Sequence, residues 1–181
     1  MPIQLENLEV YAREYGLIKR AASLNEAKAA QQETAFLCHS HKDRERAKGL
    51  QVYLEKMGWN VYIDWEDSTM PDTPNSETAD KIQRKIRDAD WFLFLVTPNS
   101  TASRWCPWEI GFADGVKPRS TIVIVPTTDR SGSWYGNEYL QLYRSVDLTT
   151  NKNLAVFAPG MTDGGILLNK MRRVTIKEVK R

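Results

Sequence analysis

The stretch WFLFLVTPNSTASRWCPWEIGFADGVKPRSTIVIVP, residues 91–126, decides the fold of this 181-residue chain. It begins with one continuous apolar run and ends with another, as is typical of strands covered on both faces of a sheet. Between the runs a helix start is predicted, with Pro107 at the first helical position and Glu109 at the third, where a carboxylate is favoured. Two buried strands joined by a helix predict a right-handed β-α-β unit and therefore a parallel sheet.

The same alternation continues on both sides of this unit. Amphipathic helices are predicted over 42–58 and 76–90, where apolar residues recur at three- and four-residue steps. Three further short strands are predicted, at TAFLCH (34–39), NVYIDW (60–65) and SVDLT (145–149). Five strands that alternate with helices predict an α/β domain built on a parallel sheet.

The two ends of the chain differ from this central pattern. Helical spacing over residues 4–32, with a break at Gly16, predicts an N-terminal helical segment that packs on the domain or on another copy of the chain. No element is predicted for the basic C-terminal end. The expected organisation is therefore a helical segment over 1–33, the main domain over 34–150, and an extension over 151–181 that packs on the domain or trails from it.

Composition excludes several classes of protein. The chain has 25 basic and 23 acidic residues, a balance that does not predict binding to nucleic acid. Its two cysteines form no CxxC motif or Cys/His cluster, which argues against a disulfide scaffold and a structural zinc site. The start of the chain lacks the apolar core of a signal peptide, and the longest apolar run is too short to cross a bilayer. We therefore expect a cytoplasmic protein without a membrane partner.

The predicted topology also places a site. In open parallel sheets, ligands bind beyond the carboxyl ends of the strands. The long loop over 65–75, which contains Pro71 and Pro74, borders that edge and has the length of a lid. The candidates for substrate contact at this edge are His39, Ser40, His41, Asp64, Trp65, Thr97–Asn99, Ser103, Trp105, Trp108 and Glu109.

Missing motifs remove other functions of this architecture. A receiver domain needs an acidic pair after its first strand, where this chain has HSH, and an aspartate at the end of the third. The phosphate-binding patterns GxGxxG and GxxxxGK[ST] and the nucleophile pattern GxSxG do not occur. His39 and His41 lack a third ligand, so no metal site is expected.

One carboxylate, Glu109, remains among large aromatic residues. Ordinary glycoside hydrolysis needs two carboxylates, because one must protonate the leaving oxygen. Nicotinamide leaves NAD already neutral, so a single ionised carboxylate can hold the ribose and stabilise its developing positive charge. The helix dipole favours an ionised Glu109, and nearby tryptophans such as Trp105 can stack on flat rings. The pattern suits an enzyme that breaks NAD, although Glu109 also fits a purely local role at the helix start.

Several segments resemble a Toll/interleukin-1 receptor (TIR) domain, and most closely the bacterial TIR proteins that consume NAD. They cover roughly residues 34–150: FLCHSHKD, VYIDWED, WFLFLVTPNSTASRWCPWEIGFA, IVIVP and SVDLT, with S-x-W-C-x-x-E the most specific part. The resemblance implies a flavodoxin-like three-layer α/β fold, the TIR fold, with a parallel five-stranded sheet and the N-terminal helical extension. It also implies that Glu109 is the catalytic glutamate, with Trp105 as the tryptophan four residues before it.

The resemblance further implies that His39 and Ser40 face the nucleotide and that Asp64 and Trp65 open the loop that covers it. Histidines stand after the first strand where common relatives have tyrosine or arginine. Trp108 is expected either to hold adenine near the ribose, which would favour cyclisation, or to pack in the core.

The function implied is NAD+ glycohydrolase or ADP-ribosyl cyclase activity in antiphage defence of the Thoeris type. NAD+ is the substrate and no cofactor is needed. Self-association through TIR–TIR contacts and a separate sensor or effector protein are expected. Two alternatives stay open: a non-catalytic TIR scaffold, and an enzyme like the nucleoside deoxyribosyltransferases, which share the sheet and also use a glutamate.

Overall fold

A computed structural model describes residues 2–14, 32–71, 73–129, 131, 136–151 and 153–171. Its strands are β1 (Ile3–Gln4), β2 (Glu33–Cys38), β3 (Trp59–Tyr62), β4 (Trp91–Val96), β5 (Ile122–Thr128), β6 (Arg144–Leu148), β7 (Leu154–Phe157) and β8 (Ile166–Leu167). Its α-helices are α1 (Leu5–Glu14), α3 (Arg44–Lys56), α4 (Ser76–Asp88), α5 (Pro98–Thr101) and α6 (Cys106–Val116). Short 3-10 helices are η1 (His41–Asp43), η2 (Asp64–Glu66), η3 (Arg119–Thr121), η4 (Glu138–Leu142) and η5 (Leu168–Lys170). Among these described helices, none is both long and apolar enough to cross a membrane.

The strands form one sheet in the order β3-β2-β4-β5-β6-β7-β8, and β1 pairs with β5. The five strands from β3 to β6 are parallel and are the five predicted ones. Their order is that of flavodoxin-like sheets, and it reverses between β2 and β4. The predicted α/β fold is confirmed, and the reversal marks the edge where a ligand site is expected.

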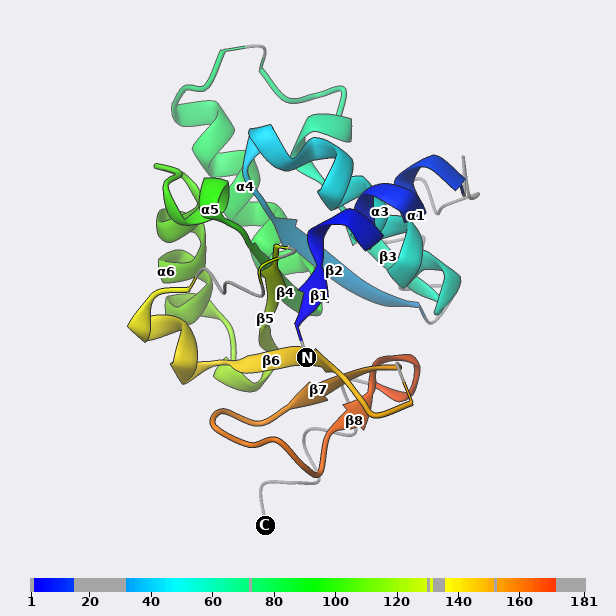
Figure 1. Cartoon of the computed structure of the whole chain (residues 1–181). Coiled ribbons are helices and arrows are strands. Elements are labelled where there is room, and N and C mark those ends of the chain that lie inside the picture. Colours follow the sequence, from blue (N-terminus) through cyan, green and yellow to red (C-terminus); the bar gives the residue numbers. More distant parts are fainter. Residues whose placement is uncertain are drawn as a thin grey trace.

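Helices cover both faces of the sheet, with α1 and α3 on one side and α4 and α6 on the other (Figure 1). Strand β4 shows why the chain needs both layers. Successive side chains of a strand point to opposite faces, so Trp91, Leu93 and Leu95 join the core under α1 and α3. Phe92 and Phe94 join the core under α4 and α6. This apolar run can be buried only when the sheet is covered on both sides.

The sheet extends beyond the five predicted strands at both ends of the chain. Gln4, predicted to be helical, lies in strand β1, which pairs with β5 through Gln4 and Thr128. The helix α1 begins one residue later, as its apolar spacing predicts, whereas the second half of the predicted N-terminal helical region lies outside the described residues. Past residue 150, where no element was predicted, β7 continues the sheet antiparallel to β6, and β8 pairs antiparallel with β7.

The described part of the N-terminal segment packs on the domain. A β-carbon added to Gly49 of α3 would lie 1.8 Å from the carbonyl oxygen of Leu8, so the two helix backbones approach as closely as a glycine allows. Leu8 is buried, and Arg46 Nε donates to Glu9 Oε1 over 3.0 Å. Helix α1 is therefore part of the layer that covers this face of the sheet.

Candidate active site

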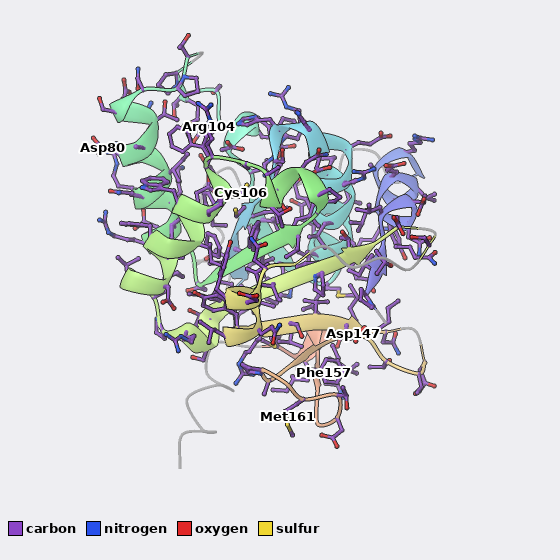
Figure 2. The ribbon with its side chains drawn as sticks, turned by 60° about the vertical axis from the view of Figure 1, so that its left-hand side comes forward. Asp80, Arg104, Cys106, Asp147, Phe157 and Met161 are labelled. Carbon is purple, nitrogen blue, oxygen red and sulfur yellow. The ribbon has the colours of Figure 1, made fainter. Side chains whose placement is uncertain are left out.

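The candidate site lies where the carboxyl ends of β2, β3 and β4 meet the start of α6. Strand β2 leads into His39 and Ser40, and the segment after β3 carries Asp64 and Trp65. Figure 2 labels Cys106, the first residue of α6, three positions before Glu109. The topology thus brings together the residue groups that the sequence predicted at this edge.

Helix α6 begins one residue earlier than predicted. Cys106 is its first residue, so Pro107 is the second and Glu109 the fourth. Ser103 Oγ accepts from the backbone N–H groups of Trp105 and Cys106, over 3.2 and 3.4 Å. The backbone N–H of Glu109 already donates to the Trp105 carbonyl over 2.8 Å. Ser103 therefore satisfies the helix start, and that local role does not explain the Glu109 side chain.

Glu109 is buried, with 5% of the residue exposed. Burial raises its pKa to about 8, and the charge of Asp64 acts in the same direction, whereas a hydrogen bond with the Cys38 thiol opposes them. The expectation that the helix dipole keeps this carboxylate ionised is wrong for the ligand-free protein. Desolvation outweighs the dipole because the side chain lies between the helix and the sheet.

The buried thiol of Cys38 lies beside Glu109, and the thiol of Cys106 is buried as well. The Cys38 Sγ donates to the Cys106 carbonyl over 3.9 Å, and burial raises the pKa of the Cys38 thiol well above its usual value. Cys106 is a small apolar filler at the helix start, as its surroundings show. Cys38 was not among the predicted neighbours of Glu109, although its place as the last residue of β2 could have indicated this contact.

His39 is buried and positions Trp65. The indole N–H of Trp65 can only donate, and it donates to His39 Nε2 over 3.0 Å. The proton of the imidazole must then be on Nδ1, which donates to the Leu37 carbonyl over 3.1 Å. Burial lowers the pKa of His39 and so favours this neutral form. Both ring nitrogens are therefore engaged within the protein.

The other residues of the β2 and β3 ends differ in exposure, since Ser40 is buried, Asp64 is half-buried and His41 is exposed. Asp64 is half-buried, and the exposed His41 brings its Nε2 to 3.7 Å from Asp64 Oδ2. Ser40 Oγ accepts from the backbone N–H of Lys42, which leaves its hydroxyl proton available. The Arg44 guanidinium lies 5.4 Å from the ring centroid of Trp65. Carboxylate, hydroxyl, imidazole and guanidinium groups thus surround this edge.

The two tryptophans near Glu109 differ in exposure. Their rings meet edge to face, with centroids 5.4 Å apart. Trp105 is half-buried and packs against the core of its face, whereas Trp108 is 37% exposed and stacks on Phe112. The alternative core role for Trp108 does not fit this exposure. Its surface can receive a flat ring.

A buried carboxylate that was not among the predicted site residues, that of Asp43, holds two loops of the site together. Asp43 accepts from Thr97 Oγ1 at the end of β4 over 2.5 Å and from Asn99 Nδ2 over 2.9 Å. Arg46 Nη1 donates to the same carboxylate over 2.8 Å. The sequence offered an indication of this role. The aspartate of the HKD motif closely follows β2, and from there it can reach the end of the neighbouring strand β4. No three His, Cys, Asp or Glu side chains are grouped to hold a metal ion in the described ranges.

Comparison with known proteins gives the family. The "Probable 3' cyclic ADP-D-ribose synthase ThsB'" of Bacillus cereus (strain MSX-D12) is 36% identical over 110 residues, 60% of this chain and 57% of that protein. The "Putative cyclic ADP-D-ribose synthase TIR2" of Cytobacillus dafuensis is 24% identical over 111 residues, 60% of this chain and 29% of that protein. The matched region thus spans little more than half of the first relative. A family model described as the TIR domain matches residues 35–157, well over half of the chain, so this protein belongs to the TIR-domain family.

Proposed function

We propose that this protein cleaves the bond between nicotinamide and ribose in NAD+, with Glu109 as the catalytic carboxylate. The observation that carries the proposal is Glu109, the one buried glutamate among the described residues, at the switch point of the sheet and next to an exposed tryptophan surface. The names of the two relatives, both cyclic ADP-D-ribose synthases, support the same substrate class.

The chemistry needs one carboxylate. The electrons of the broken bond go to the pyridinium, so nicotinamide leaves neutral and the ribose C1′ becomes cationic. Glu109 as an anion would stabilise that charge, and the buried position of this carboxylate strengthens the attraction. Water, or a hydroxyl group of the same ADP-ribose, then bonds to C1′ and loses a proton, which gives a linear or a cyclised product.

Ionisation of Glu109 is then coupled to substrate binding. The buried carboxyl carries its proton at neutral pH in the ligand-free protein, because burial raises its pKa to about 8. The fixed positive charge of the pyridinium next to this group favours the anion. Binding of NAD+ would therefore release a proton, and the resting protein would hold its catalytic group in the neutral form.

The remaining residues have roles in substrate contact. Trp105 and Trp108 would stack on nicotinamide or adenine, and Trp65 would close over the nucleotide in the position that His39 gives it. Ser40, His41, Asp64 and Ser103 supply polar groups around the ribose and phosphates. Because Glu109 is almost fully covered, entry of the ribose requires movement of the covering side chains, for which the loop over 65–75 is the candidate.

The wider setting proposed is that of the TIR resemblance. The protein would act in the cytoplasm, without nucleic acid or membrane as a partner, in antiphage signalling or NAD+ depletion. Copies of the chain would assemble through TIR–TIR contacts, and a separate protein would supply the trigger or read the product.

One observation favours a non-catalytic TIR scaffold as a second candidate. Glu109 is neutral and covered in the ligand-free protein, as a structural residue would be. The match to a TIR domain gives no support to the nucleoside deoxyribosyltransferase hypothesis.

Nicotinamide release from NAD+ by concentrated protein separates the two candidates. Wild type is compared with Glu109→Gln, and with Glu138→Gln as a control that changes an exposed glutamate on η4. Release by wild type and Glu138→Gln but not by Glu109→Gln supports the enzyme, and the mass of the nucleotide product tells hydrolysis from cyclisation. Equal release by all three proteins would exclude Glu109 as the catalytic group. No release from any of them, even from assembled protein, would favour the scaffold.

A further inference from the structure

The reaction proposed for Glu109 releases a proton that still needs an acceptor. After nicotinamide has left, an oxygen of water or of a ribose hydroxyl group donates a lone pair to C1′. The new bond makes that oxygen positive until its O–H bond breaks. Nicotinamide leaves with the electron pair of the broken bond and does not take this proton. A base placed beside the reacting oxygen would therefore speed the second step.

The imidazole of His41 is placed to act as this base. His41 begins η1 and follows β2 closely, and its side chain is 59% exposed. Its Nε2 lies 3.7 Å from Asp64 Oδ2. When the proton on Nε2 faces this carboxylate, Nδ1 is the nitrogen that can accept a further proton. Histidine suits proton transfer near neutral pH, and an exposed imidazole can pass the proton on to solvent.

Asp64 is held where it can orient His41. Its Oδ1 accepts from the backbone N–H of Trp65 over 2.9 Å, while its Oδ2 faces the imidazole. The charge of Asp64 also reaches Glu109, where it adds to the effect of burial in raising the pKa, so the two carboxyl groups belong to one site. A carboxylate that orients an imidazole and stabilises its charged form is a recurring arrangement in hydrolases.

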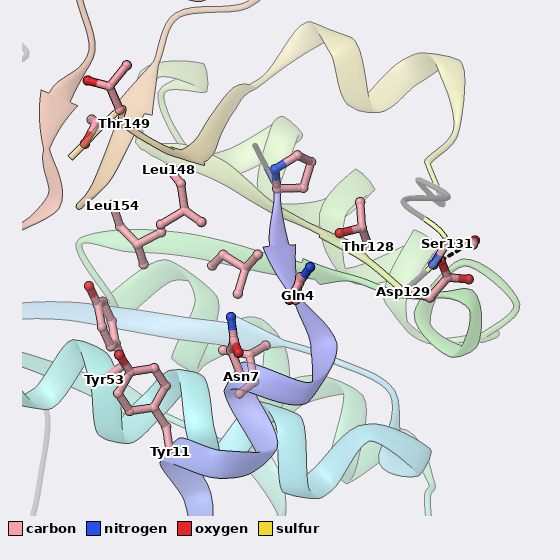
Figure 3. Close-up of a pocket in the computed structure, with 14 residues that line it drawn as sticks. Gln4, Asn7, Tyr11, Tyr53, Thr128, Asp129, Ser131, Leu148, Thr149 and Leu154 are labelled. Atoms are coloured by element: carbon pink, nitrogen blue, oxygen red, sulfur yellow. Dashed lines mark hydrogen bonds between the residues drawn. The ribbon is translucent and has the colours of Figure 1, made fainter. Parts of the chain in front are cut away.

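Two other places in the molecule do not supply this base. His39 is the second of the two histidines in the chain, and both of its ring nitrogens are engaged, with the Trp65 indole and the Leu37 carbonyl. A pocket of about 970 Å³ lies between α1 and the segments that follow β5 and β6 (Figure 3). Its described lining residues include no histidine and none of the candidate site residues.

We propose that His41 is the general base of this second step and that Asp64 orients it, an assignment that rests on the proposed cleavage of NAD+ at Glu109. The acceptor oxygen bonds to C1′, its O–H bond breaks, and the proton goes to Nδ1 of His41. The positive charge of C1′ thus passes to the imidazole, which faces Asp64 until the proton leaves for solvent. Return of nicotinamide to C1′ needs no base, because its ring nitrogen carries no proton.

Turnover of NAD+ by the full chain in the presence of isotope-labelled nicotinamide separates the two routes. Labelled NAD+ reports the return of nicotinamide, and linear plus cyclic ADP-ribose report the route that loses a proton. The ratio of their initial rates is independent of the amount of folded protein and of the rate of the first cleavage, which both routes share.

His41→Gln keeps a polar group towards Asp64 but cannot accept the proton. Its ratio of labelled NAD+ to ADP-ribose should exceed that of wild type at least about tenfold. Asp64→Asn should raise the ratio by a smaller factor, because the imidazole stays but loses the carboxylate that orients it. Glu138→Gln changes an exposed glutamate on η4 and should leave the ratio unchanged.

An unchanged ratio in His41→Gln would overturn the assignment, because another group, such as Glu109 itself, would then take the proton. Active wild type that incorporates no labelled nicotinamide would overturn it as well, since the two routes would share no intermediate. Formation of neither product by concentrated wild type would mean that the proposed cleavage fails, and the role of His41 fails with it. Active wild type with a failed ratio test removes the role of His41 alone.

Discussion

Replacement of Glu109 by glutamine should make the protein less sensitive to alkaline pH. The folded protein holds a proton on this carboxyl up to a pKa of about 8, whereas the unfolded chain releases it near the ordinary value of 4.5. Over that interval the folded state binds more protons than the unfolded state, so the free energy of unfolding falls as pH rises. Glutamine is close in shape to the protonated acid and does not titrate. It therefore removes this loss.

The size of the effect follows from the two pKa values. Each pH unit between them changes the free energy of unfolding by about 1.4 kcal/mol. The difference in stability between Glu109→Gln and wild type should thus grow by about 3 kcal/mol from about pH 5.5 to about pH 7.5, in favour of the variant. Water that enters beside the ionised carboxylate would reduce this figure, which makes it an upper limit.

Urea unfolding at a series of pH values measures this difference directly. The titration of the buried His39 occurs in both proteins and cancels when one curve is subtracted from the other. Glu138→Gln is the control, and its curve should run parallel to that of wild type. Parallel curves for wild type and Glu109→Gln would refute the reasoning, because they would mean that the folded protein holds Glu109 as an anion throughout.

Three further results are expected. If NAD+ is the substrate, kcat/KM should rise with pH towards about 8, since the free enzyme must lose the Glu109 proton, and an initial-rate profile that is flat from about pH 6 to 8 would contradict this. Gly49→Ala should lower the free energy of unfolding by about 2 kcal/mol or more, because the new methyl group meets the backbone of α1. Gly115→Ala has open space around it and should raise the free energy of unfolding by up to about 1 kcal/mol. Urea unfolding of both variants tests this pair. Thr97→Val should cost about 1 to 3 kcal/mol in the same assay, because Asp43 loses a buried donor and the backbone N–H of Ser100 loses the Thr97 Oγ1 that caps α5. An unchanged midpoint would mean that neither bond contributes to stability.

The parallel sheet could be predicted from the sequence because its central strand β4 is apolar over its whole length. The run at 91–96 has no polar residue to mark an exposed face, so a two-sided cover was the only solution. Strand β1 has two residues and β7 has four, lengths at which pairing partners, rather than local pattern, decide the structure. These strands form because β5 and β6 have backbone groups available to pair with them. A short window of sequence does not contain the pairing partner and so cannot predict them.

In the candidate site, too, some features could be predicted from the sequence and others depend on contacts with distant residues. Position at the sheet edge is a property of topology, so Glu109, Asp64 and Trp65 could be predicted from strand order alone. The charge state of Glu109 depends on what covers it, and the dipole of its own helix was a poor guide because burial has the larger effect. The neutral tautomer of His39 likewise depends on Trp65, which follows a different strand.

A resting neutral glutamate has a consequence for control of the proposed enzyme. A buried carboxylate anion would destabilise the folded protein before the substrate arrives, because burial of an unpaired charge is unfavourable. A buried neutral carboxylic acid avoids this destabilisation. Anything that ionises Glu109, whether the pyridinium of NAD+ or a change in the packing of Trp105 and the loop over 65–75, would switch on the chemistry. Assembly of TIR domains would act at this step if it moved those covering groups, because a partly opened site stabilises the anion before the substrate binds. The pH dependence of stability and the pH dependence of turnover should then report the same proton, and both should shift to lower pH in the assembled protein.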